Sequence, residues 1–162
     1  GSPCHTYGSI PRVGEKAPCY TLVKPDLSEV HCADFQGKRV VLNIFPSLDT
    51  AVCAASVRRF NQEAAGLENT AVICVSMDLP FAAGRFCTAE GIDGLIVGSA
   101  FRSPMFGQKY GLQIVDGPLA GLLARAVIVL DEDRNVIYSD LVEEITNEPK
   151  YDEALDVLRN TK

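Results

Sequence analysis

One stretch constrains the fold of this chain more than any other: an apolar run that ends at a proline and leads into an amphipathic segment. Residues 40–45 read VVLNIF, which is β-rich and short enough to be a buried strand. Pro46 ends that strand, because proline has no N–H for a ladder hydrogen bond and its own φ is fixed. After a short connection, Thr50 suits the N-cap of a helix that we predict over residues 51–67.

Cys53 lies in the first turn of this predicted helix. Unpaired N–H groups and a partial positive charge favour an anion at that end of a helix. The thiolate is the reactive form of cysteine, so this position favours reactivity. Arg58 and Arg59 follow about a turn later and would add positive charge if they turned toward the sulfur. Free cysteines are usually buried and inert, however, and position alone leaves both interpretations open.

The rest of the chain alternates between strand and helix patterns. Residues 20–23 and 29–31 predict a short hairpin near the N-terminus, and residues 1–8 have weak β character. Further strands are predicted over residues 70–77, 95–97, 124–130 and 135–142, and further helices over residues 81–90, 103–110 and 151–158. Pro80 fits the first position of the helix over 81–90. Such a series of units followed by a hairpin indicates an α/β sheet with an antiparallel edge.

Length and charge exclude several classes of protein. A chain of 162 residues fits a single domain, residues 1–162, without internal repeats. The formal net charge of −6 argues against a nucleic-acid-binding surface and offers no basic patch for a membrane. No apolar run approaches the roughly 20 residues that a membrane-spanning helix needs. We therefore expect no nucleic-acid partner and no membrane partner.

Cysteine usage points to thiol chemistry rather than to a metal site. The chain has 6 cysteines and 2 histidines, with no C-x-x-C pair and no spacing typical of zinc. The cysteines are also too sparse for the disulfide framework of a small secreted domain. An intracellular enzyme with a few redox-active thiols is the simpler interpretation.

The stretch around Cys53 also matches a known family. Pro46-x-x-x-Thr50-x-x-Cys53 resembles the active-site signature of peroxiredoxins, and residues 42–58 are similar to the thiol peroxidase branch in particular. The likeness extends over nearly the whole chain, through residues 78–82, 85–87, 116–122, 124–127 and 144–149. The resemblance implies an α/β thioredoxin fold of the peroxiredoxin type with an N-terminal β-hairpin extension.

The resemblance also implies roles for individual residues. Cys53 would be the peroxidatic sulfur that attacks the peroxide, and Thr50 would cap the helix and contact the sulfur or the peroxide. Pro46 would shape the loop and screen the sulfur from water, beyond simply ending the strand. Arg125 precedes an apolar strand, where sequence alone favours an exposed strand-end arginine. The family match instead makes it a guanidinium that binds the thiolate and a polarised peroxide oxygen.

By the same resemblance, Cys87 is the resolving cysteine that forms an intramolecular disulfide with Cys53. A disulfide requires Cα atoms within about 7 Å, so two cysteines on separate helices need local unwinding to pair. Cys74 lies in a buried strand pattern and is predicted to be structural. The remaining thiols, Cys4, Cys19 and Cys32, are interpreted as incidental.

The predicted function is a thiol-dependent peroxidase that reduces hydrogen peroxide and organic hydroperoxides. The family implies thioredoxin as the reductant, a homodimer, a location in the bacterial cytoplasm, and no metal, haem or flavin cofactor. Two alternatives remain. A redox-sensing or chaperone-like protein would use the same disulfide as a switch, and a general disulfide oxidoreductase is weakened by the missing C-x-x-C.

Overall fold

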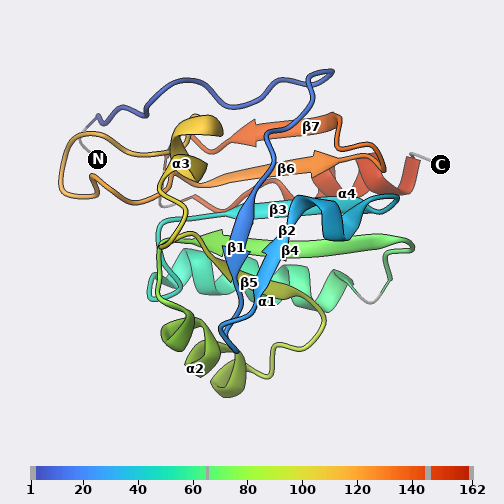
Figure 1. Cartoon of the computed structure of the whole chain (residues 1–162), viewed down its shortest axis with the longest axis horizontal. Coiled ribbons are helices and arrows are strands. Elements are labelled where there is room, and N and C mark those ends of the chain that lie inside the picture. Colours follow the sequence, from blue (N-terminus) through green and yellow to red (C-terminus); the bar gives the residue numbers. More distant parts are fainter. Residues whose placement is uncertain (1–2, 65, 145–146, 161–162) are drawn as a thin grey trace.

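A seven-stranded mixed sheet forms the centre of the molecule (Figure 1). The computed structural model describes residues 3–64, 66–144 and 147–160. In the sheet the strands run in the order β2-β1-β5-β4-β3-β6-β7. The strands are β1 Thr21–Val23, β2 Glu29–His31, β3 Arg39–Ile44, β4 Thr70–Ser76, β5 Ile96–Ser99, β6 Ala126–Leu130 and β7 Val136–Leu141.

The three central strands are parallel and the flanking strands are antiparallel. β3 pairs in parallel with β4, and β4 pairs in parallel with β5. β6 pairs antiparallel with β3, and β7 pairs antiparallel with β6. At the opposite edge the β1–β2 hairpin joins the sheet antiparallel, with Val23 opposite Ser99. The α/β sheet with an antiparallel edge, predicted from the order of elements, is confirmed.

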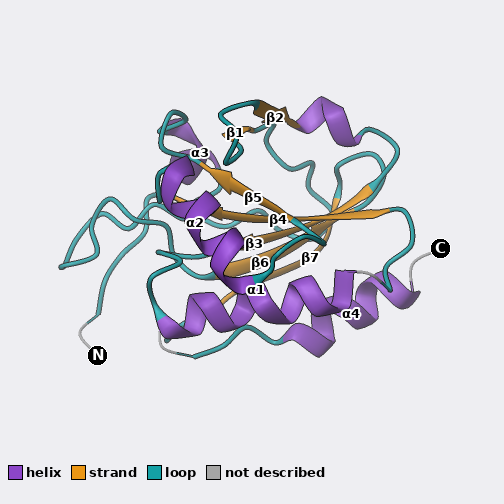
Figure 2. Ribbon diagram, turned by 90° about the horizontal axis from the view of Figure 1, so that it is seen from below, coloured by secondary structure: helices purple, strands orange, loops and turns teal. Residues whose placement is uncertain are grey.

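Helices cover one face of this sheet, and the hairpin with a short helix covers the other (Figure 2). α1 (Ala51–Ala64) and α4 (Tyr151–Asn160) lie together, with the Phe60 and Tyr151 rings in edge-to-face contact at 5.4 Å. α2 (Pro80–Glu90) packs on the same face beside β5. The 3-10 helix η1 (Cys32–Phe35) and α3 (Met105–Lys109) lie on the hairpin side.

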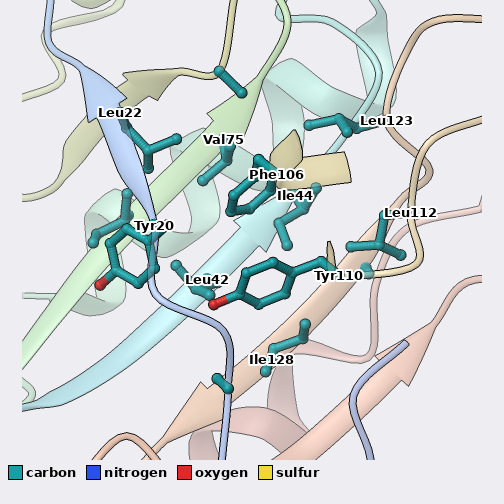
Figure 3. Close-up of a cluster of buried hydrophobic side chains, with 14 of the residues drawn as sticks. Tyr20, Leu22, Leu42, Ile44, Val75, Phe106, Tyr110, Leu112, Leu123 and Ile128 are labelled. Atoms are coloured by element: carbon teal, nitrogen blue, oxygen red, sulfur yellow. The ribbon is translucent and has the colours of Figure 1, made fainter. Parts of the chain in front are cut away.

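The alternation of side chains along the strands explains these two layers. Leu42 and Ile44 of β3 point into the larger core, where they meet Tyr20, Leu22 and Tyr110 (Figure 3). Val41, the residue before Leu42, points to the opposite face and packs against α1 and α4. Both faces of the central strands are therefore buried, as their continuous apolar sequence requires.

Most element boundaries lie within a few residues of the predicted ones. α1 ends at Ala64 rather than at residue 67, and α3 spans Met105–Lys109 rather than 103–110. Pro80 is the first residue of α2, as predicted. The weakly β-like stretch 1–8 contributes, within residues 3–8, one isolated antiparallel bridge between Thr6 and Ile114. Close approach there explains Gly111, where any side chain would meet the Ser9 backbone.

Candidate active site

Cys53 is the third residue of α1, the helix that follows the loop after β3. Its amide donates a hydrogen bond to the Thr50 hydroxyl at 3.3 Å, and the Ala54 amide donates to the Thr50 carbonyl at 3.0 Å. Thr50 is therefore the N-cap that the sequence predicted. The Cys53 side chain is fully buried, with 0% of its surface exposed, although the helix terminus around it lies at the surface.

Asp78 fixes the loop between β3 and α1 to the end of β4. Its carboxylate accepts a hydrogen bond from the Ser47 hydroxyl at 2.8 Å and another from the Leu48 amide at 2.7 Å. The Ser76 hydroxyl donates to the same carboxylate at 2.7 Å. The Ser99 hydroxyl donates to the Asp78 carbonyl, which joins the end of β5 to the same residue. Asp78 lies in the family-like stretch 78–82, but the sequence alone indicates no role for it.

A buried polar network connects the first turn of α1 to β3 and β4. The Ser56 hydroxyl donates to the Cys53 carbonyl at 2.8 Å and accepts from the Asn43 amide at 3.2 Å. The same Asn43 nitrogen lies 3.5 Å from the Cys74 sulfur. Asn43, Ser56 and Cys74 all have side chains that are buried. The only signal for this network in the sequence was an asparagine inside an otherwise apolar strand.

Cys87 lies in the last turns of α2 and packs against the same apolar cluster that contains Cys53 and Cys74. The cluster also includes Phe45, Leu48 and Val57. The structure therefore brings the two cysteines predicted to be peroxidatic and resolving to one cluster, each with a free thiol. The Cys87 carbonyl accepts hydrogen bonds from the amides of Gly91 and Ile92, which close the end of the helix.

Burial governs the acidity of two of these thiols. It raises the pKa of Cys74 to about 12, and this effect outweighs the opposing hydrogen bond from Asn43. A negative charge on Cys87, where that thiol is ionised, adds to the increase in the pKa of Cys74. Burial also raises the pKa of Cys87. Both thiols therefore stay protonated at neutral pH in the folded state.

Pro46 and Arg125 lie near the same end of the sheet. Pro46 is buried and follows β3 after Phe45, as predicted for a strand terminator. Arg125 directly precedes β6, whose Ala126 pairs with Ile44. Arg125 is only 2% exposed, so the exposed strand-end arginine that sequence alone favoured is wrong. The positive charge of Arg125 also acts on Tyr151 of α4. Burial raises the pKa of Tyr151, and the Arg125 charge tends to lower it.

The charges of Arg58 and Arg59 are directed at carboxylates. Arg58 pairs with Glu90 at the end of α2 at 3.4 Å. Arg59 pairs with Glu63 at 3.3 Å and with Asp152 of α4 at 3.0 Å, and its guanidinium lies 5.2 Å from the Tyr151 ring centre. Glu63 lies on α1 itself, whereas Glu90 lies on α2 and Asp152 on α4. The last two ion pairs therefore join α1 to its neighbouring helices.

A disulfide joins Cys19 and Cys32, with Cα atoms 5.4 Å apart. The interpretation of these two cysteines as incidental thiols is therefore wrong. The hairpin causes the pairing: Thr21 lies opposite His31, so the residues just outside the paired strands come together. Extending the predicted hairpin by one or two residues would have revealed it. Cys4 is exposed and free.

Comparisons with known proteins decide the family. The family model described as Redoxin matches residues 12–155. The chain belongs to the Redoxin family. It is 55% identical to a thiol peroxidase from Corynebacterium glutamicum over 158 residues, which cover 98% of this chain and 95% of that protein. This redoxin is therefore a thiol peroxidase-type member, a peroxiredoxin enzyme, as the motif around Cys53 indicated.

Solved structures confirm the fold of this redoxin. A peroxiredoxin-like protein from Aquifex aeolicus superposes with a TM-score of 0.92 at 42% identity, covering 98% of this chain and 92% of that one. A thiol peroxidase from Chromobacterium violaceum superposes with a TM-score of 0.86 at 22% identity, covering 96% and 90%. The peroxiredoxin-type thioredoxin fold with an N-terminal hairpin, implied by the resemblance, is confirmed.

Within residues 3–64, 66–144 and 147–160, no three His, Cys, Asp or Glu side chains gather as a metal site would require. No helix in this described part of the chain has the length and apolar character needed to cross a bilayer.

Proposed function

We propose that this thiol peroxidase-type redoxin reduces hydrogen peroxide and organic hydroperoxides with the sulfur of Cys53. One observation carries the proposal: Cys53 is the third residue of α1, with its amide hydrogen-bonded to the Thr50 hydroxyl and its side chain shielded from water. A helix N-terminus stabilises negative charge, and low water content strengthens that effect. The relative named a thiol peroxidase supports the same reaction.

The proposed first step is a displacement at oxygen. The Cys53 thiolate attacks one peroxide oxygen, the O–O bond breaks, and the second oxygen leaves as water or an alcohol after taking a proton. Cys53 is left as a sulfenic acid. We assign Thr50 to orienting the peroxide, since its hydroxyl can both donate and accept. We assign Arg125 to stabilising the charge on the leaving oxygen, and Pro46 to keeping bulk water out.

Peroxide access and disulfide formation both require local opening. Cys53 has no exposed surface, so a peroxide reaches it only when the loop over residues 46–50 parts from its neighbours. Cys87 then attacks the Cys53 sulfenic acid, and water leaves as the disulfide forms. We expect the last turn of α2 to unwind in this step. Unwinding also exposes Cys87, which removes the burial that raises the pKa of its thiol.

The remaining parts of the proposal concern partners and location. A dithiol protein, thioredoxin by family resemblance, would reduce the Cys53–Cys87 disulfide and restart the cycle. Such a cycle suits the bacterial cytoplasm, where dithiols are kept reduced. We also propose a homodimer with its interface near the active-site loops. Leu79 and Phe81 support this, since they flank Pro80 at the start of α2 and are 52% and 70% exposed.

Peroxide turnover with thioredoxin, thioredoxin reductase and NADPH tests the proposal. The wild-type chain is expected to consume peroxide continuously. Cys53→Ser is expected to lose all turnover, and Cys87→Ser to consume about one equivalent and stop at the sulfenic acid. Cys4→Ser is the matched control, because Cys4 is an exposed free thiol far from the cluster in sequence, and it should keep full turnover. Turnover by Cys53→Ser at the wild-type rate would refute the proposal.

The same assay separates the rival functions. A redox sensor or chaperone-like protein would be oxidised at Cys53 but would not consume peroxide repeatedly. A general disulfide oxidoreductase would reduce insulin disulfides, and this chain is not expected to do so. A structure of the trapped Cys53–Cys87 disulfide in which α1 and α2 both reach their full length would contradict the unwinding step.

A further inference from the structure

The Cys19–Cys32 disulfide closes the open end of the β1–β2 hairpin. Thr21 pairs with His31 in the last register position, and the Cys32 amide donates to the Tyr20 carbonyl at 3.0 Å. The neighbouring carbonyls are also anchored: the Tyr110 hydroxyl donates to the Pro18 carbonyl at 2.6 Å. The Ser103 hydroxyl donates to the Thr21 carbonyl at 2.6 Å. The backbone around Cys19 is therefore fixed by α3 and the residues beside it.

The two sulfurs of this disulfide have different surroundings. Cys19 is an exposed residue and lines a pocket of about 400 Å³ between the start of β1 and α3. Cys32 is only 8% exposed and faces the interior. We therefore take Cys19 as the side from which a nucleophile would attack, which makes the Cys32 sulfur the one that leaves.

A guanidinium stands beside the sulfur that would leave. Nη1 of Arg134 lies 3.4 Å from the Cys32 sulfur. Nε of the same arginine donates to the Ala17 carbonyl at 2.9 Å, and the Ala17 amide donates back to the Arg134 carbonyl at 2.9 Å. The arginine is thus fixed in place by the segment that leads into Cys19. A positive charge at this position stabilises a thiolate, which makes a better leaving group.

The pocket on the Cys19 side also carries positive charge. Arg102 and Lys109 both line it, beside Met105 and Phe106. Glu29 of β2 lies 3.9 Å from the Arg102 guanidinium and offsets part of its charge. A pocket with a cationic wall raises the local concentration of an anionic nucleophile such as a thiolate.

We propose that the Cys19–Cys32 disulfide is a second redox site of this chain, open to reduction by a protein dithiol through the pocket at Cys19. A thiolate of the dithiol attacks the Cys19 sulfur, the Cys19–Cys32 bond breaks, and the electron pair leaves on Cys32 beside Arg134. The second thiol of the dithiol then attacks the mixed disulfide and releases Cys19. The dithiol loses two electrons and two protons, and Cys19 and Cys32 gain them. This site does not depend on peroxide reduction at Cys53.

Stoichiometry in a chain without the other reactive thiols tests the proposal. The background carries Cys4→Ser, Cys53→Ser and Cys87→Ser, and is prepared with the Cys19–Cys32 disulfide intact. With thioredoxin, thioredoxin reductase and NADPH, it is expected to oxidise about one equivalent of NADPH per chain. Adding Cys19→Ser is expected to abolish this. A disulfide that thioredoxin leaves intact in the folded chain, yet reduces once urea has unfolded it, would overturn the proposal.

The site of attack provides an independent measurement. Thioredoxin with a single active-site cysteine traps the mixed disulfide, and peptide mapping is expected to find it on Cys19. Trapping on Cys32 would overturn the assigned direction. Lys109→Gln is expected to slow trapping roughly threefold at low ionic strength, and the effect should fade with added salt. Lys16→Gln is the matched control, because Lys16 lies outside the pocket, and an equal slowing there would refute attraction by the pocket.

Discussion

Three thiols share one apolar cluster, yet their surroundings suit them to different tasks. Cys53 sits at the N-terminus of α1 with its amide bound to the Thr50 hydroxyl. Cys74 is enclosed in β4 and its pKa is raised strongly by burial. Cys87 is half-buried near the end of a helix, and its pKa is raised in the same direction. All three belong to the cluster, so what distinguishes the residue proposed to attack is its place at the start of a helix. The other two lie inside a strand and near the end of a helix.

The raised pKa of Cys74 predicts a loss of stability at alkaline pH. Its folded value is about 12 against an unfolded value of 9.0, so the unfolded thiol loses its proton first as pH rises. This contribution is fully present below about pH 9 and is lost as pH increases toward 12. By pH 10 the loss due to Cys74 should reach about 1.4 kcal/mol, measured by urea unfolding of the wild type and Cys74→Ala at pH 8, 9 and 10.

Two variants isolate this effect. Cys74→Ala is expected to remove about 1.4 kcal/mol of the pH dependence between pH 8 and 10, whatever its stability at pH 8. Cys4→Ala should keep the slope of the wild type, because that thiol is exposed. Four tyrosines and Cys87 also have raised pKa values and begin to titrate in the unfolded chain within this window, so the effect of Cys74 is the difference in slope between the wild type and Cys74→Ala. An unchanged slope in Cys74→Ala would show that burial does not control this thiol.

Sequence reasoning found residues whose role depends on near neighbours in the chain. Thr50 and Cys53 are three residues apart, so the capping bond follows from the start of a helix. Asn43 and Ser56 meet across a strand and a helix, and Asp78 reaches back 30 residues to Leu48. Such contacts depend on which strands are adjacent, and one sequence without the sheet order cannot supply that information. The burial of Arg125 could not be predicted for the same reason, because it follows from the pairing of β6 with β3.

At the scale of elements, the loop between β3 and α1 is held from one side by a single carboxylate. Asp78 accepts hydrogen bonds from Ser47, Leu48 and Ser76, which joins the loop to the end of β4. The proposed reaction requires this loop to open for peroxide and to close again around the sulfur. Asp78 should therefore affect both the stability of the chain and the rate of peroxide reduction.

Asp78→Ala is predicted to reduce the free energy of unfolding by about 2–3 kcal/mol, because hydrogen bonds to a charged acceptor are lost. Peroxide reduction, measured as kcat/KM, should fall by about tenfold or more as the loop loses its closed position. Asp78→Asn keeps an acceptor and should lose less of both. Asp49→Ala is the matched control in the same loop, since its carboxylate is 79% exposed and reaches Arg85 at 3.9 Å. Equal losses in Asp78→Ala and Asp49→Ala would contradict the assignment.

The elements themselves were largely predictable, and their ends were not. Apolar runs such as 70–77 gave β4, and proline gave the start of α2, because these signals are local. The end of α1 at Ala64 and the five residues of α3 depend on packing against neighbours that the sequence does not locate. The short helix η1 was not predicted, since it continues directly from β2 at Cys32.

At the scale of the molecule, the β1–β2 hairpin is the least integrated part of the sheet. In the described pairing β1 meets β5 only where Val23 lies opposite Ser99, whereas β3 and β4 pair over six positions. Side chains compensate, because Tyr20 and Leu22 reach into the larger core (Figure 3). The Cys19–Cys32 disulfide adds a covalent constraint at the open end of the same hairpin.

Removal of that disulfide is therefore predicted to destabilise the chain, most visibly at the hairpin. The bond closes a loop with a sequence separation of 13, for which the chain-entropy model gives about 3 kcal/mol. Cys19→Ser with Cys32→Ala should lower the free energy of unfolding by that amount, in the single cooperative transition that the predicted single domain implies. Amide exchange should accelerate first in β1 and β2, and later in β3 and β4. Cys4→Ser should change neither measurement. If the double variant kept the stability and the hairpin protection of the wild type, the side chains of Tyr20 and Leu22 alone would be sufficient to hold this edge.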